Sequence, residues 1–122
     1  MHEEYKEILI IITRLLTNLG VPANIKGFDC LRLSILYVYL NDINCNTRIT
    51  KDVYPYVGKC KNKNSKTIES LIRKTIENTW FNADLIIKKE IFGSIDENTR
   101  INPTNKEYIY TIADKLKLNM IN

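Results

Sequence analysis

A chain of 122 residues, of which 44% are hydrophobic and 26% charged, can bury a core of its own and has the composition of an ordinary globular domain. The longest apolar run covers residues 8–12, far fewer than the ~20 residues that span a bilayer, so we expect no membrane-spanning helix. The first residues are acidic and no small-residue cleavage site follows them, which argues against a signal peptide.

The residues that support catalysis or metal binding are sparse. Cys30, Cys45 and Cys60 form no C-x-x-C pair, and we interpret them as reduced thiols of a cytoplasmic protein rather than as a zinc site or a disulfide framework. The only histidine, His2, lies at the terminus, and the four glycines are not clustered into a phosphate-binding loop. We therefore expect no enzyme, no cofactor and no metal.

The first two predicted elements are helices. Residues 3–19 carry apolar side chains at the 3.6-residue period, and Gly20 followed by Pro22 ends this helix. After a loop, a second helix is predicted over residues 29–41.

A short third helix is predicted from Thr50, as its N-cap, to Lys59. Pro55 falls inside it, and proline is tolerated best in a first helical turn. We therefore expect this helix to be short or bent at Pro55. A polar connector at residues 62–65 follows it.

The remaining chain predicts three further helices. The fourth covers residues 65–82, and the fifth begins at residue 82 or 83 and is ended by Gly93. Residues 94–103 read as irregular, with a short extended pair as one arrangement. The last helix runs over residues 104–118, after a proline. Six helices with short connectors predict one compact all-α domain over residues 1–122, and the polar turn between the third and fourth is compatible with a helix-turn-helix.

The basic residues are concentrated in one segment. Residues 59–74 hold six cations against a single acid, Glu69, so the rest of the chain is close to neutral, although the net charge is +4. A local excess of this kind is the footprint of a surface that binds a polyanion. The predicted phosphate contacts are Lys59, Lys61, Lys63, Asn64, Ser65, Lys66 and Lys74, together with Lys26.

The fourth helix has two distinct faces. Its apolar residues recur at steps of three and four, which places the opposite face in solvent. That outer face offers Arg73, a fork suited to guanine O6 and N7, Glu69, an acceptor suited to cytosine N4, and the small Ser70. An ordinary amphipathic surface helix fits the same pattern, so the pattern alone leaves both interpretations open.

Several strings in fixed order resemble a known family. They are LGVPANIKG (19–27), ITKDVYP (49–55), IR (72–73), IENTW (76–80), IFG (91–93), PTN (103–105) and ADKLKL (113–118). The chain resembles the C-terminal effector domains of the stage zero sporulation response regulators of endospore-forming bacteria. The resemblance implies a six-helix, sequence-specific DNA-binding domain whose third and fourth helices form the helix-turn-helix.

The resemblance also implies roles and departures. The family reads bases with a glutamate and two arginines. The glutamate corresponds to Glu69, one arginine to Arg73 and the other to Ser70, and a further family arginine corresponds to Thr67. With serine and threonine at two basic positions, we expect relaxed or altered specificity. Met1 leads directly into the first helix, which favours a natural relative without a receiver domain over an excised domain.

We therefore expect a cytoplasmic transcriptional regulator that binds double-stranded DNA. The RNA polymerase sigma subunit, which the resemblance implies, and a second copy of the chain on DNA are further expected partners. An alternative is a protein-interaction module that keeps the fold and modulates the full-length regulator or the polymerase without reading DNA.

Overall fold

The computed structural model describes residues 2–41, 46–93 and 101–118 of the chain. These residues form six α-helices: α1 (His2–Asn18), α2 (Lys26–Asn41), α3 (Tyr54–Lys61), α4 (Ser65–Thr79), α5 (Leu85–Phe92) and α6 (Asn105–Lys117). A π-helical turn η1 (Ile49–Val53) precedes α3, and a 3-10 turn η2 (Trp80–Asn82) follows α4. The predicted all-α class is confirmed, and no helix in the described ranges is both long and apolar enough to cross a bilayer.

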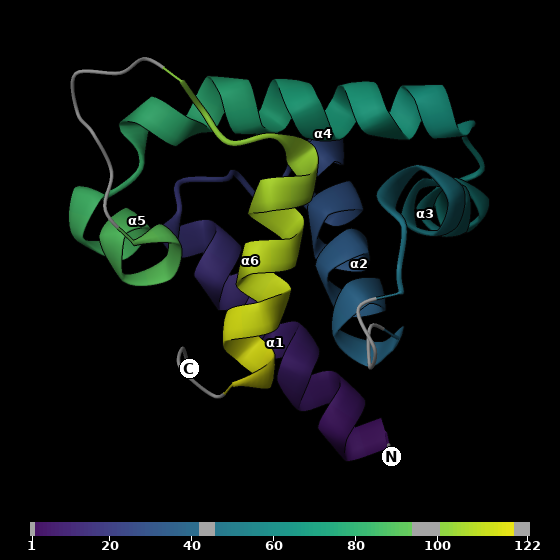
Figure 1. Ribbon diagram of the computed structural model, residues 1–122, viewed down its shortest axis with the longest axis horizontal. Coiled ribbons are helices and arrows are strands. Elements are labelled where there is room, and N and C mark those ends of the chain that lie inside the picture. Colours follow the sequence, from purple (N-terminus) through teal and green to yellow (C-terminus); the bar gives the residue numbers. More distant parts are fainter. Residues whose placement is uncertain (1, 42–45, 94–100, 119–122) are drawn as a thin grey trace.

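Helix α2 lies at the centre of the domain. Its residues are apolar around most of the circumference, which is typical of a helix that is covered on several sides. It packs against α1, α3, α4 and α6. In Figure 1, α4 runs across the top of the view and α2 and α6 rise toward it. Helix α3 is seen end-on beside the start of α4.

The N-terminal ends of α2 and α6 are fixed against α4 by close contacts. Gly27 near the start of α2 is buried, and a Cβ added there would lie 1.7 Å from Thr75 Oγ1 and 3.1 Å from the Leu71 carbonyl oxygen. At the start of α6, the Asn105 amide donates to the Tyr54 hydroxyl (3.0 Å) and to the Glu69 carbonyl (3.1 Å). Helix α4 therefore packs against the starts of α2 and α6 as well as against α3, and none of the described helices covers its opposite face.

Local end signals place most helix boundaries as predicted. Gly20 has a left-handed backbone (φ 82°) after α1, and Gly93 (φ 81°) follows α5. Thr104 caps α6 in a capping box with Glu107. Helix α5 begins at Leu85, slightly later than predicted, because the Asp84 carboxylate accepts from the first amides.

Two predicted boundaries are wrong in an informative way. Helix α2 begins at Lys26 rather than residue 29, and Gly27 in its first turn lies against Thr75 on α4. The predicted helix from Thr50 to Lys59 is a π-helical turn that ends at Val53, followed by α3 from Tyr54. Helix α3 is short, as expected from Pro55, which has no N–H to donate and lies in its first turn. Thr50 does not cap it; the Arg48 amide bonds to the Asp52 carboxylate (2.8 Å) instead.

Several sequence predictions lie outside the described residues. These are the extended pair, most of which falls in residues 94–100, the state of Cys45, and the side chain of His2. Of the other two cysteines, Cys30 is buried and Cys60 is exposed.

The end of α4 is held by a buried lysine that the sequence pattern does not mark. Lys88 on α5 is only 6% exposed, yet its ammonium donates to the Trp80 carbonyl (2.9 Å) and lies 5.1 Å from the centroid of the Trp80 ring. A buried lysine needs such a partner, since an unpaired charge in the interior is costly. The contact joins α5 to the turn that follows α4.

Tyr108 provides a stability prediction because its hydroxyl is buried without a hydrogen-bond partner among the described residues. Its ring packs near Trp80 and Phe92, and burial raises the pKa of Tyr108. We expect Tyr108→Phe to leave the free energy of unfolding unchanged or to raise it by up to about 1 kcal/mol, since it removes an unsatisfied group.

Tyr54→Phe is the matched control, because the Tyr54 hydroxyl accepts from Asn105 (3.0 Å) and its loss should cost about 1 kcal/mol. Urea unfolding of both variants measures the difference. A loss of stability in Tyr108→Phe as large as that in Tyr54→Phe would show that the Tyr108 hydroxyl has a partner after all.

Candidate nucleic-acid interface

The turn between α3 and α4 is built from close backbone contacts. Asn62 adopts a left-handed conformation (φ 56°), and the amides of Asn62 and Lys63 both donate to the Gly58 carbonyl. A Cβ added at Gly58 would lie 2.5 Å from the Lys63 carbonyl oxygen. The tight turn therefore requires glycine at this position and fixes where α4 begins relative to α3.

The start of α4 is capped by a side chain. The Asn64 side chain accepts the Thr67 amide (2.8 Å), which is the usual role of asparagine at an N-cap. The remaining amides of the first turn have no partner within the helix, as at every helix start. Such a start favours a negatively charged group.

The inner face of α4 anchors it in the core as predicted. Ile68, Ile72 and Ile76 are at most 1% exposed, and Trp80 is also buried. Leu71, which the pattern places inward, is only half-buried at the edge of this face.

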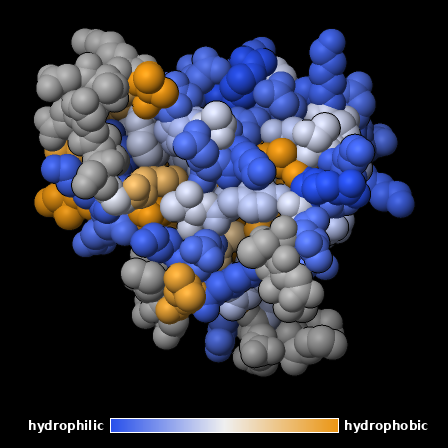
Figure 2. All heavy atoms as spheres, viewed as in Figure 1, coloured by the Kyte–Doolittle hydropathy of each residue, from blue (hydrophilic) through white to orange (hydrophobic). Residues whose placement is uncertain are grey.

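On the outer face, Lys66, Arg73 and Lys74 are exposed and Ser70 is half-buried. In Figure 2, the upper edge of the molecule, along which α4 lies, is mainly hydrophilic.

Arg73 points outward, and its ion pairs with described residues all lie within its own helix. It donates from Nε to Glu69 (3.1 Å) and from Nη1 to Glu77 (3.3 Å), and 48% of its side-chain surface is exposed. Glu69 first, and Glu77 with it, raise the pKa of Arg73, so it is charged at any physiological pH. Among the helices of the described ranges, none covers Arg73, which leaves the guanidinium accessible to a ligand.

A hollow of about 450 Å³ lies beside this side chain. Glu69, Arg73 and Glu77 line one wall, and residues 102–106 at the start of α6 line the other. Asn105, which ties α3, α4 and α6 together there, is a residue that helical periodicity does not identify. Its position in the string PTN (103–105) is the signal that marks it in the sequence.

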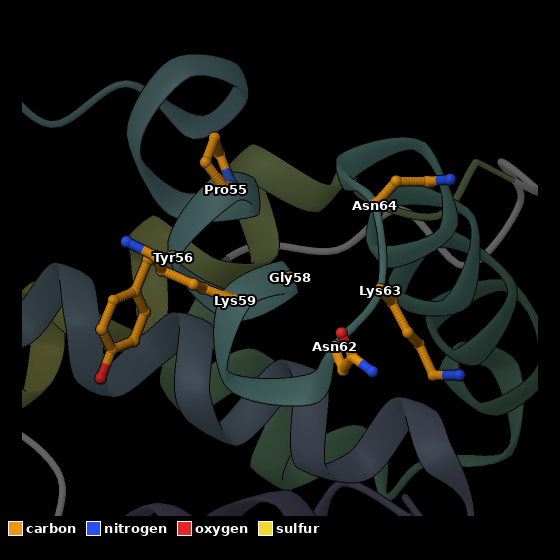
Figure 3. A pocket seen from close by; sticks show the side chains of 7 residues that line it. All are labelled: Pro55, Tyr56, Gly58, Lys59, Asn62, Lys63 and Asn64. Atoms are coloured by element: carbon orange, nitrogen blue, oxygen red, sulfur yellow. The ribbon is translucent and has the colours of Figure 1, made fainter.

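A second hollow, of about 670 Å³, lies over the turn (Figure 3). It is lined by residues from α3, the turn and the α4 cap: Pro55, Tyr56, Gly58, Lys59, Asn62, Lys63 and Asn64. The structure thus brings Lys59, Lys63 and Asn64 together, as the clustered charge in the sequence suggests.

Lys61 is directed differently from its neighbours. Its ammonium pairs with the Asp29 carboxylate on α2, and Asp29 also accepts from Arg32 (2.7 Å). Lys26, at the first position of α2, is exposed. Among the predicted phosphate contacts, Lys61 is therefore the one whose ammonium forms an ion pair with another helix in the described part of the chain.

The ion pairs of Asp29 with Lys61 and Arg32 lead us to expect that the domain loses stability in acid. Lys61 chiefly, and Arg32 secondarily, hold the pKa of Asp29 below its usual value, although partial burial opposes this. A depressed pKa stabilises the folded state above the unfolded pKa, ~3.9, and this contribution is lost as the pH falls through the folded pKa. We expect Asp29→Asn to lower the free energy of unfolding by about 0.5–1 kcal/mol at pH 7, because the pair is partly exposed and screened.

Urea unfolding at pH 7 and pH 3 measures this effect. The difference between Asp29→Asn and the unmodified chain should be smaller at pH 3. Asp114→Asn, at an exposed carboxylate of α6, is the control and should change stability little at either pH. An Asp29→Asn effect that is the same at both pH values would contradict the role of its charge.

A family model described as "Sporulation initiation factor Spo0A C terminal" matches residues 12–116. Together with the fold, this match defines a class: an all-α DNA-binding effector domain of a transcriptional regulator. The match covers most of the chain, and the chain belongs to this family. The resemblance seen in the sequence is thereby confirmed.

Proposed function

We propose that the protein is a cytoplasmic, sequence-specific transcriptional regulator that reads the major groove of double-stranded DNA with α4. The observation that carries this proposal is the orientation of α4. Its isoleucines are buried, while Arg73 and Lys66 are exposed on a face that no other described helix covers. In this proposal α3 and α4 act as a helix-turn-helix, in which the second helix enters the groove.

Three side chains on α4 are proposed to contact bases. Arg73 donates to guanine O6 and N7, Glu69 accepts from cytosine N4, and Ser70 contacts either partner of a base pair. Ser70 stands where the resemblance places an arginine, and Thr67 stands where it places another. We therefore propose a target sequence that differs from that of the sporulation regulators.

The phosphate contacts are proposed to surround the start of α4. Lys59 and Lys63 line the hollow over the turn, Lys66 and Lys74 flank the reading face, and the first amides beyond Asn64 and Ser65 face the backbone. Lys26 is exposed and is kept as an outer contact. Lys61 is left out, because Asp29 already neutralises it.

The salt dependence of binding tests the number of these contacts. The four lysine–phosphate contacts around α4, counted without the outer Lys26, should give a slope of log affinity against log salt of roughly −3 to −4. Lys63→Ala should weaken binding to all sequences alike and reduce the magnitude of the slope by about 1. Titration of a labelled duplex over a range of salt concentrations measures both, and a slope near zero would contradict the proposed surface.

A second candidate function rests on an exposed apolar surface. Phe81 on η2 is 51% exposed and Ile86 on α5 is 70% exposed. Large apolar side chains in this position suit a protein partner, and we propose the sigma subunit of RNA polymerase for it, or a second copy of the chain on DNA.

Binding of purified sigma subunit, with Phe81→Ser and Ile86→Ser as variants, tests this surface. Binding that both variants abolish supports the partner. Binding that neither variant changes contradicts this surface, and concentration-dependent association of the chain alone identifies the second copy.

A further inference from the structure

A carboxylate that the proposed base contacts do not use lies one helical turn beyond Arg73. Glu69, Arg73 and Glu77 form a ladder of alternating charge along one side of α4, joined by the hydrogen bonds of 3.1 Å and 3.3 Å. The three side chains are between 38% and 48% exposed, so the ladder borders solvent. Opposite charges at i,i+4 steps attract each other and orient the guanidinium along the helix.

The nitrogens that donate in this ladder determine which N–H groups of Arg73 remain free for a ligand. A guanidinium is a planar fork with five N–H donors. A bidentate contact with guanine O6 and N7 needs two neighbouring nitrogens. Glu69 is bonded to Nε and Glu77 to Nη1. Each terminal nitrogen carries two N–H groups, so one N–H of Nη1 and both of Nη2 remain free. Arg73 can therefore present the end of its fork to a guanine while both carboxylates hold the guanidinium in place.

We propose that Glu77 is a specificity-determining positioning residue. It holds Arg73 away from the phosphates of random DNA and keeps the free end of its fork in one orientation. Its own charge repels the phosphates of every duplex, whereas only a target with guanine at the right position gains the bidentate contact of a guanidinium held in this way. This inference rests on the proposed function of α4.

The test compares Glu77→Gln with the unmodified chain on two duplexes, one selected from a random library and one with the same composition in scrambled order. Glutamine keeps the length of the side chain and removes its charge. The affinity for the scrambled duplex should rise about two- to five-fold, the range expected for one exposed ion pair. The affinity for the selected duplex should rise less, so that the ratio of the two affinities falls about two-fold or more.

Glu90→Gln is the matched control, because Glu90 is an exposed carboxylate on α5 for which no ion pair is found in the described part of the chain. It should leave the ratio unchanged. In an Arg73→Ala background, Glu77→Gln should also leave the ratio unchanged, since no guanidinium remains to be held. Urea unfolding should show that Glu77→Gln keeps the stability of the unmodified chain.

The outcomes separate this inference from the proposed function. If the unmodified chain prefers the selected duplex and Glu77→Gln does not lower that preference, Glu77 has no such role. If Glu77→Gln lowered the preference in the Arg73→Ala background as well, the inference would also be overturned, because Glu77 would then act through its own charge alone. A chain without any sequence preference would instead refute the proposed reading of DNA by α4.

Discussion

Arg73→Ala is expected to weaken binding to the target duplex by about 1–3 kcal/mol, the range for loss of one bidentate arginine–guanine contact. The effect should be confined to one base pair: the variant should tolerate any base there and keep its preferences elsewhere. The structural reason is that Arg73 is exposed and that its partners in the described part of the chain are carboxylates of its own helix. Titration of the target and of its single-base variants measures both effects.

Arg14→Ala is the control for this prediction, because it removes the same charge from an exposed position on α1. In Figure 1, α1 lies at the opposite end of the domain from α4. Arg14→Ala should reduce affinity slightly and change no base preference. If Arg73→Ala behaved like Arg14→Ala, the assignment of α4 as the reading helix would be wrong.

Gly58→Ala is expected to lower the free energy of unfolding by about 1–3 kcal/mol, although alanine has the better helix propensity by about 1 kcal/mol. The new Cβ would lie 2.5 Å from the Lys63 carbonyl oxygen, a backbone atom that cannot rotate away. The turn would have to open, and the start of α4 would move relative to α3. We therefore expect weaker DNA binding even under conditions in which the variant is folded.

Urea unfolding and duplex titration measure the two effects of Gly58→Ala. Lys59→Ala provides the comparison for stability, since Lys59 is exposed on the same helix and alanine meets no obstacle there. Its stability should be unchanged within ~0.5 kcal/mol. A Gly58→Ala protein as stable as Lys59→Ala would show that the turn can accommodate a side chain.

The parts of the fold that the sequence predicts are those with local causes. The isoleucines of α4 recur at helical spacing because one face is buried, and the spacing alone identifies that face. The ends at Gly20 and Thr104 depend on the residues that stand there, one with a left-handed backbone and the other with a capping side chain. Such features need no knowledge of the tertiary structure.

The parts that the sequence does not predict depend on distant partners. Lys61 belongs by position to the cationic segment, but Asp29, 32 residues away, turns it toward α2. Gly27 at the start of α2 lies against Thr75, and Asn105 bonds to residues 36 and 51 positions away. Neither the spacing nor the composition of the sequence indicates these contacts. The residues of the candidate site are therefore predicted, but the distant residues that position them are not.

Selection from a library of random duplexes, followed by sequencing, tests the central claim most directly. The proposed function predicts enrichment of a defined sequence that contains a guanine, and Arg73→Ala should lose the preference for that guanine alone. Recovery of sequences without any enrichment, by a chain that is folded in the same buffer, would contradict the proposal that α4 reads DNA.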